Sequence, residues 1–332
     1  MPAEYDGLRQ SASGLQLLPY RDMPIRDSIC RSMSLHRNIL RAAIYSVKDR
    51  KYRIWAGIKE DESVKFRPCI DIHNGKVKQI VGGSLRDTGD QARENFVSEQ
   101  DAAFYAALYR DSGLQGGHVI LLNPEDSPYY QETKKQALNA LKTYPEGLQI
   151  GGGVCPENAE DYLDAGASHV IVTSYVFRNG RLSWENLEKI EKETGKEHLV
   201  LDLSCRKKNG AYYIVTDRWQ KFTDVKITLD TLRELGAHCD EFLIHGVDVE
   251  GKAGGIEAEL VKLLAEYGER SVTYAGGVGS MEDIRTLEVY GKGKLDVTVG
   301  SALDLFGGKI PFDSLKKLNR NQSQSMEELC QQ

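Results

Sequence analysis

From Phe66 onward, short runs of apolar, largely β-branched residues alternate with longer stretches whose apolar residues recur with helical period. This alternation is typical of successive strand–helix units around a parallel sheet. The strands are expected at Phe66–Ile72, Gly117–Leu122, Leu148–Gly151, His169–Thr173, His198–Leu203, Glu241–His245, Ser271–Ala275 and Asp296–Val299. The helices are expected near Glu99–Asp111, Gln131–Thr143, Pro156–Asp164, Ser183–Glu193, Thr228–Leu235, Glu257–Tyr267, Met281–Val289 and Ala302–Phe306. Eight units in roughly 250 residues favour a closed (βα)8 barrel, the TIM barrel, over an open doubly wound sheet.

The two ends of the chain lack this alternation, so we expect the barrel to occupy residues 63–318. Residues 1–62 form an N-terminal extension, in which the stretch from Ser28 to Lys48 carries basic residues and no acidic ones. Such a composition is typical of an organelle transit peptide, which would place the protein in a chloroplast or other plastid. The alternative is a disordered extension on a cytoplasmic protein. Residues 319–332 are polar and are expected to fray.

Composition narrows the kinds of ligand. Apolar residues make up 40% and charged residues 28% of the chain, and no apolar run is long enough to span a membrane. A net charge of −6 provides no general attraction to nucleic acid or to an anionic membrane, so a small molecule is the expected partner. The chain is expected to be a monomer, although the sequence does not fix the oligomeric state. The six cysteines are scattered and are expected to be reduced thiols. We expect no metal, because five histidines do not fall at ligand spacing: His73, His118, His169, His198 and His245.

An internal repeat divides the barrel into two similar halves. The segment GGV occurs at Gly152–Val154 and again at Gly276–Val278. Upstream of each, Cys69–Val81 resembles Val200–Val215: both have an aspartate near the end of a strand, followed by a basic hairpin that contains glycine. Downstream, VIVTSYVF resembles VTVGSALDLF. One half-barrel of four units has therefore been used twice.

The repeat places Asp71 and Asp202 at matching positions on opposite sides of the barrel mouth, where active sites of this fold lie. A carboxylate within an apolar strand is costly to bury without a partner, so its presence twice suggests use. The alternative for each is an aspartate that caps the following loop. Two facing acids can divide the work of an isomerisation, one protonating while the other removes a proton. Ser174 and Ser301 lack the neighbours of a nucleophilic triad.

The glycine turns form a second set of candidate residues. Glycines let backbone N–H groups approach an anion, and the helices beginning at Pro156 and Met281 add partial positive charge. The following strand ends supply further donors. Two such sites across one barrel predict a substrate with a phosphate at each end. The candidate phosphate-binding residues are Gly152, Gly153, Thr173, Ser174, Gly276, Gly277, Gly300 and Ser301.

These motifs together resemble the HisA family of histidine biosynthesis, phosphoribosylformimino-5-aminoimidazole carboxamide ribotide isomerase, and its eukaryotic branch most closely. The resemblance covers Lys65 to Phe312, the whole barrel. It is carried by IDIHNGKVKQIVGGSL, GGHVILLN, QIGGGV, LDLSCRKKNG, FLIHGVDVEG, AGGV and VGSAL.

The resemblance implies an Amadori rearrangement that converts an aminoaldose into an aminoketose without cofactor or metal. It implies that Asp71 is the general base that takes the proton from C2 of the opened sugar. Asp202 would be the general acid that assists ring opening and formation of the Schiff base. Trp219 matches an aromatic residue that stacks on the substrate, although a plain surface or core tryptophan is the alternative.

Three positions depart from the bacterial pattern of the family. His245 stands where many relatives have threonine, Leu121 where they have aspartate, and Cys155 where they have arginine. These departures concern how the carboxamide and the second arm of the substrate are held. His245 would either bond to the substrate or tune Asp202; a structural histidine is the alternative.

Two other functions remain open. The sister cyclase of the same pathway shares the half-barrel repeat, the aspartates and both phosphate sites, but it works with a glutaminase, for which this chain has no room. The hairpin SCRKKNG and the loop GGSL also resemble the isomerase more closely. A non-catalytic barrel that binds phosphorylated metabolites would not need two buried carboxylates. Whether a tryptophan-pathway substrate is also accepted stays undecided.

Overall fold

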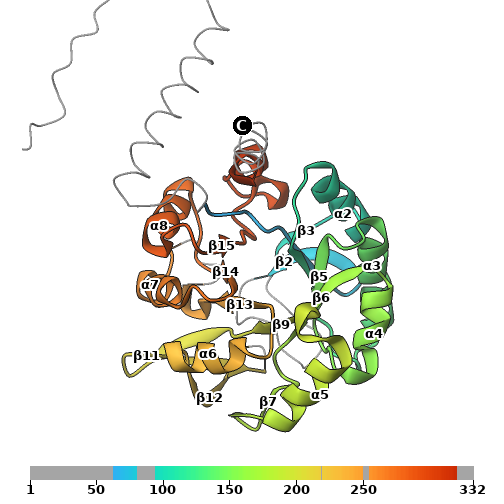
Figure 1. Ribbon diagram of the computed structural model, residues 1–332. Coiled ribbons are helices and arrows are strands. Elements are labelled where there is room, and N and C mark those ends of the chain that lie inside the picture. The colour runs from blue at the N-terminus through green and yellow to red at the C-terminus, as the bar shows by residue number, and fades with distance from the viewer. Residues whose placement is uncertain (1–62, 81–93, 218, 250–253, 320–332) are drawn as a thin grey trace, which may run out of the picture. The chain divides into compact units, whose positions relative to one another are not determined.

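The computed structural model describes residues 63–80, 94–217, 219–249 and 254–319 (Figure 1). The expected N-terminal extension, residues 1–62, therefore lies outside the described residues. So does the expected polar tail, except for its first residue. Asn319 ends a helix over residues 312–319, and its side chain bonds to both the N–H and the C=O of Phe66, at 2.9 and 3.1 Å.

Eight parallel strands form the central sheet, and they follow one another around it in chain order, which confirms the expected barrel. The three expected strands at residues 148–151, 241–245 and 271–275 have the predicted bounds, and the bounds of the other five shift by at most three residues. The strands are β1 (Cys69–His73), β4 (Gly117–Leu121), β5 (Leu148–Gly151), β6 (Ala167–Val172), β9 (Leu199–Asp202), β13 (Glu241–His245), β14 (Ser271–Ala275) and β15 (Asp296–Val297).

The barrel closes where the chain just before β1 pairs with β15. Phe66 forms a parallel bridge with Val297. Arg67 N–H donates to Val297 C=O at 2.8 Å, and Val297 N–H donates to Lys65 C=O at 2.9 Å. In Figure 1 the blue start of the barrel accordingly meets its red end. Closure leaves no open edge in this ring of eight strands.

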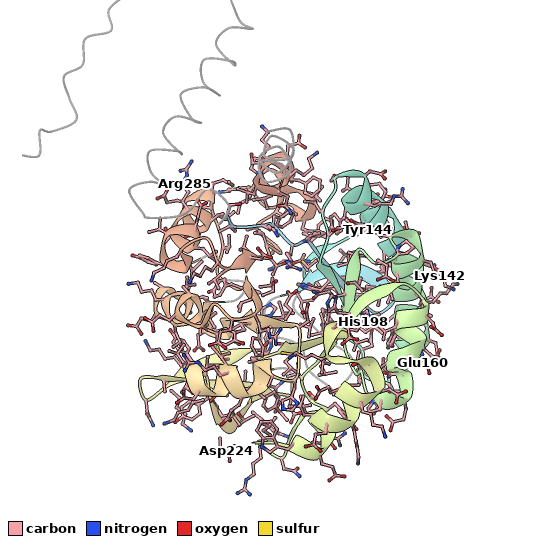
Figure 2. The ribbon with its side chains drawn as sticks, in the orientation of Figure 1. Lys142, Tyr144, Glu160, His198, Asp224 and Arg285 are labelled. Carbon is pink, nitrogen blue, oxygen red and sulfur yellow. The ribbon has the colours of Figure 1, made fainter. Side chains whose placement is uncertain are left out.

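Amphipathic helices cover the outside of the barrel, each burying its apolar face against the strands. Polar side chains such as Lys142 and Glu160 are exposed on the outer face (Figure 2). Several helices begin with a side-chain cap of the usual kind, for example Asp101 and Ser183. The helices are α2 (Ala102–Asp111), α3 (Tyr130–Thr143), α4 (Pro156–Asp164), α5 (Trp184–Thr194), α6 (Leu229–Gly236), α7 (Ala258–Tyr267) and α8 (Met281–Gly291).

The expected eighth helix at Ala302–Phe306 is wrong. Only one 3-10 turn forms there, η3 (Asp304–Phe306). It ends at Gly307, whose φ of 79° is left-handed and cannot continue a helix. The helix that packs on this part of the barrel comes later, over residues 312–319, and it buries Phe312 and Leu315.

Antiparallel hairpins follow three of the strands. The expected hairpins after β1 and β9 are present, and both turn through an Asn-Gly pair with positive φ, Asn74–Gly75 and Asn209–Gly210, as tight hairpin turns require. A third Asn-Gly hairpin follows β6 and was not anticipated. The hairpin strands are β2 (Lys76–Ile80), β3 (Glu94–Val97), β7 (Phe177–Arg178), β8 (Arg181–Leu182), β10 (Cys205–Lys208), β11 (Ala211–Thr216) and β12 (Lys221–Lys226).

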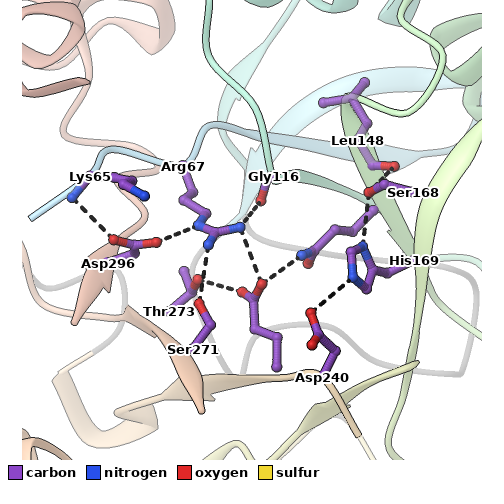
Figure 3. A network of polar contacts seen from close by, with 12 residues as sticks. Lys65, Arg67, Gly116, Leu148, Ser168, His169, Asp240, Ser271, Thr273 and Asp296 are labelled. Atoms are coloured by element: carbon purple, nitrogen blue, oxygen red, sulfur yellow. Dashed lines mark hydrogen bonds and ion pairs between the residues drawn. The ribbon is translucent and has the colours of Figure 1, made fainter. Parts of the chain in front are cut away.

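Side chains fill the barrel interior in layers, because alternate residues of each strand point inward. The end nearest the strand N-termini holds a polar network centred on the buried Glu241. Figure 3 shows this network around Arg67, Thr273 and Asp296. The Glu241 carboxylate lies 3.1 Å from the guanidinium of Arg67 and accepts from Gln149 at 3.0 Å and from Thr273 at 2.6 Å. Arg67 is held also by Asp296, at 2.7 Å. Burial by itself lowers the pKa of Arg67. The carboxylates of Glu241 and Asp296 together raise the pKa by more than burial lowers it, so the net shift is upward and the guanidinium stays charged.

An apolar layer lies above this network. It is formed by Ile171, Val200 and Leu243, with Ile120 packed against them. The next inward positions along the strands, including Asp71 and Asp202, reach the barrel mouth.

We predict that Arg67→Met lowers the free energy of unfolding by about 3 to 5 kcal/mol, since it leaves the buried Glu241 carboxylate without its cation. Urea unfolding monitored by circular dichroism measures the change. The matched control is Lys189→Met, which removes an exposed 2.7 Å pair with Glu185 on α5 and should leave stability nearly unchanged, because solvent screens an exposed pair. Equal losses in both variants would contradict a structural role for this network.

Candidate active site

A cavity of about 930 Å³ opens at the barrel mouth, at the strand C-termini. We call it the mouth cavity. Its lining includes side chains from both halves of the barrel and the turns that follow β14 and β15. Eight of the twelve residues singled out in the sequence line it: Asp71, Asp202, Trp219, His245, Gly276, Gly277, Gly300 and Ser301.

Asp71 reaches the mouth cavity from β1, between the fully buried Ile70 and Ile72, which face the helices. Gln79 of β2, itself 4% exposed, donates its amide N–H to Asp71 Oδ2 at 3.3 Å. An amide donor favours the ionised form of a carboxylate. Sequence reasoning missed Gln79, which the hairpin that folds β2 back onto β1 brings within hydrogen-bond distance of Asp71.

Asp202 reaches the same cavity from the end of β9. Its Oδ1 accepts both from the N–H of Ser204, at 2.8 Å, and from the hydroxyl of Ser204, at 2.7 Å. The loop-capping contact considered as the alternative is therefore present. It does not exclude a second role, because both donors bond to Oδ1. The other oxygen, Oδ2, has no hydrogen-bond partner among the residues that the structure describes.

Trp219 and His245 form one aromatic wall of the mouth cavity. Their ring centroids lie 5.4 Å apart at an angle of 40°. Trp219 has a φ of 66°, a strained conformation for a bulky side chain, in the loop between β11 and β12. In the described structure His245 Nδ1 is buried without a hydrogen-bond partner. A buried polar atom without a protein partner is expected to bond to a ligand or to water.

The floor of the cavity carries two polar residues that sequence reasoning did not assign to the site. His118 is fully buried, and burial first, then His245 and Arg67, lower its pKa to about 3, so its imidazole is neutral at physiological pH. Thr298 follows β15, and its buried hydroxyl has no partner within the described ranges. Neutral donors and acceptors of this kind suit an uncharged polar group such as an amide.

The second glycine turn lies in the mouth cavity. Gly277 has a φ of 75°, and a Cβ there would lie 2.1 Å from the carbonyl oxygen of Gly255, so only glycine fits. The N-terminus of α8 is already capped by the hydroxyl of Ser280. Asp283 also accepts the N–H of Gly279 at 3.0 Å. An anion here would therefore depend on the turn amides and Ser301 rather than on the end of α8.

The first glycine turn lies elsewhere. Gly153 and Ser174 line a second cavity of about 1460 Å³, which we call the side cavity, together with Cys155, Arg178 and Lys221. The loop between β11 and β12 contributes residues to both cavities. The two expected phosphate sites are thus distributed over two cavities rather than facing each other within one.

Two further residues of the first glycine site, Gly152 and Thr173, line neither cavity. At Gly152 a Cβ would lie 2.2 Å from the carbonyl oxygen of Leu121, so this glycine permits close packing of the turn on β4. Leu121, one of the departures from the family pattern, is 3% exposed and belongs to the apolar core. Cys155, another departure, lines the side cavity, and burial raises the pKa of its thiol.

The described part of the chain contains no group of three or more His, Cys, Asp or Glu side chains placed to hold a metal ion. None of the helices within the described ranges is both long and apolar enough to span a membrane.

Comparison with known proteins defines the class. A family model described as histidine biosynthesis protein matches residues 65–311, which include all eight barrel strands. The chain belongs to this family.

The names of the chain's relatives specify an enzyme within this family. A chloroplastic protein of Medicago truncatula is 52% identical over 268 residues, covering 80% of this chain and 84% of the relative. Relatives from Neurospora crassa and Saccharomyces cerevisiae are 44% and 42% identical, each covering 78% of this chain and 99% of the relative. All three are named as imidazole-4-carboxamide isomerases, and the compound in their names carries two 5-phosphoribosyl groups. The expectation of an isomerase of histidine biosynthesis is confirmed at the level of enzyme class.

We predict that the stability of the wild type falls more steeply than that of His118→Gln as the pH is lowered. The pKa of His118 is about 3 in the folded protein and about 6.5 in the unfolded chain, so between these values only the unfolded chain binds the proton. The stability that neutral His118 contributes is complete above pH 6.5 and is reduced by about 2 kcal/mol at pH 5. Thermal unfolding of both proteins from pH 8 to pH 4 measures this difference. Parallel curves would show that His118 titrates normally.

Proposed function

We propose that this enzyme catalyses the Amadori rearrangement of phosphoribosylformimino-5-aminoimidazole carboxamide ribotide, from aminoaldose to aminoketose. The observation that carries the proposal is that Asp71 and Asp202, from matching positions in the two half-barrels, line one cavity at the barrel mouth. The names of the relatives support the same substrate.

In the proposed reaction, Asp202 protonates the ring oxygen of the ribose as the bond from C1 to that oxygen breaks. The nitrogen lone pair forms the C=N bond of a Schiff base. Asp71 then removes the proton from C2, and the electron pair of the C–H bond moves through C1 to the nitrogen, forming an enaminol. Loss of the O2 proton and protonation at C1 yield the aminoketose, so atoms and electrons balance without a redox partner.

The surroundings of each aspartate suit its proposed role. Gln79 donates to Asp71 Oδ2, which favours the ionised carboxylate needed for a base. Both donors of Ser204 bond to Asp202 Oδ1, so Oδ2 is the oxygen that can carry the transferred proton. Two carboxyl groups in different hydrogen-bonding environments can therefore hold different protonation states.

The rest of the substrate is assigned by chemical fit. The imidazole ring stacks on the wall formed by Trp219 and His245, since flat aromatic groups prefer such contacts. The carboxamide bonds to the floor, where His118, His245 and Thr298 present neutral polar atoms. One phosphate lies at the turns of Gly277 and Ser301, and the other lies in the side cavity at Gly153 and Ser174.

We expect Asp71→Asn and Asp202→Asn each to lower kcat by about 10²- to 10⁴-fold, because a positioned acid or base contributes roughly that factor. Substrate affinity should stay within a few-fold of the wild type, since the amide keeps the size of the carboxylate. Steady-state turnover of the purified aminoaldose, with EDTA present and without ammonia or glutamine, measures both quantities.

The matched control is Asp224→Asn, an exposed carboxylate of β12 whose loss should leave kcat unchanged. Full turnover by either active-site variant would refute the acid and base assignment. Turnover that requires ammonia and cleaves the substrate would instead identify the sister cyclase.

A plastid location is also proposed, on the basic composition of the N-terminal extension and the chloroplastic relative from Medicago truncatula. A fluorescent protein fused behind residues 1–62 is expected to enter plastids in leaf cells. The chain from residue 63 onward should keep the kcat of the full chain, because every barrel strand lies within it. A cytoplasmic signal from the fusion would refute the location, and the turnover assay would be unaffected by that result.

A further inference from the structure

The two cavities differ in charge, although their glycine turns come from the same repeat. None of the described residues that line the mouth cavity is a lysine or arginine. The side cavity is lined by two cationic side chains, Arg178 and Lys221, and by one carboxylate, Asp217. Lys221 and Asp217 lie 2.6 Å apart, so each largely neutralises the other. Arg178 therefore supplies the unbalanced charge of this cavity.

Arg178 is held at the wall by the hairpin that follows β6. The hairpin is fixed to the barrel end, because the N–H of Phe177 donates to the C=O of Thr173 at 3.0 Å and Phe177 is buried. Arg178 stands at the end of β7, just before the Asn-Gly turn, and its guanidinium lies 5.7 Å from the ring centre of Tyr175. This stacking restricts the side chain while leaving its donors at the cavity.

No carboxylate in the described structure forms an ion pair with Arg178. Its charge reaches Glu157, whose pKa is lowered first by the thiol of Cys155 and only weakly by Arg178. Arg178 is itself exposed, and so is Arg181, its cross-strand neighbour, but Arg181 pairs with Asp224 at 3.6 Å. The same hairpin thus carries one arginine facing a cavity and one paired on the surface.

One backbone donor near this cavity is already used. The N–H of Cys155, at the start of α4, donates to the side chain of Asn158 at 3.0 Å. Burial raises the pKa of the Cys155 thiol, so its side chain adds no charge. Arg178 is thus the charged group that complements a dianion in the side cavity, and its planar fork of N–H groups matches two phosphate oxygens.

From this geometry we propose that Arg178 binds a phosphate monoester in the side cavity and is a further residue that positions one arm of the substrate. The proposal rests on the proposed function only for the identity of that phosphate.

The first experiment needs no turnover. Inorganic phosphate is titrated into the full chain while the amide NMR signals of Gly153 and Ser174, in the side cavity, and of Gly277 and Ser301, in the mouth cavity, are followed. Phosphate should bind at the side cavity, with an affinity that falls as KCl is raised. Arg178→Gln should weaken that binding about fivefold or more and leave the mouth cavity unchanged.

Arg181→Gln is the matched control, because it removes the same charge from the same hairpin away from the cavity. It should not change either affinity, and Arg178→Lys should restore binding in part. If Arg178→Gln and Arg181→Gln weakened phosphate binding equally, the proposal would be overturned, because the loss would then come from the net charge of the hairpin and not from a contact with Arg178. Unchanged phosphate binding in Arg178→Gln would also overturn it.

The second experiment uses the substrate. Arg178→Gln should raise KM about fivefold or more at low salt, with kcat within twofold of the wild type, because Arg178 lies outside the cavity that holds both aspartates. A lower kcat with unchanged KM would contradict a binding role. If the wild type does not turn over this substrate, the proposed function fails, while the phosphate titration still decides whether Arg178 binds phosphate.

Discussion

The closure of the barrel between Lys65–Arg67 and Val297 is the constraint on which the rest of the structure depends. Hydrogen bonds join the two ends of an eight-stranded sheet, and Arg67 reinforces the seam through its ion pair with Asp296. A closed ring gives each strand a fixed position relative to all the others. The first and fifth strands, which carry Asp71 and Asp202, consequently lie on opposite sides of one opening.

The layers inside the barrel separate stability from chemistry. At one end, Glu241 and Arg67 form a buried network whose hydrogen bonds are all made between protein groups. At the other end, His245 and Thr298 leave polar atoms without partners in the described structure, and these atoms face a cavity. The apolar layer formed by Ile171, Val200 and Leu243 lies between them. A satisfied network holds the barrel together, while unsatisfied groups remain for a ligand.

The two half-barrels keep the same plan but have diverged in their details. Both have an aspartate, a hairpin and a glycine turn. The donors around the aspartates differ, since Asp71 is bonded to Gln79 and Asp202 to Ser204. The charge around the glycine turns also differs, because only the side cavity has Arg178. This loss of symmetry agrees with the different roles proposed for the two aspartates.

The order of the strands, the repeat and the positions of Asp71 and Asp202 were determined by the sequence alone, because residue periodicity and an internal repeat are local patterns. The eighth helix was misplaced, since Gly307 ends the turn after Phe306 and the true helix follows. Gln79, His118 and Arg178 could be identified only from the tertiary structure. Each comes from a different strand or hairpin, and no spacing in the chain encodes which residues meet when a sheet closes into a barrel.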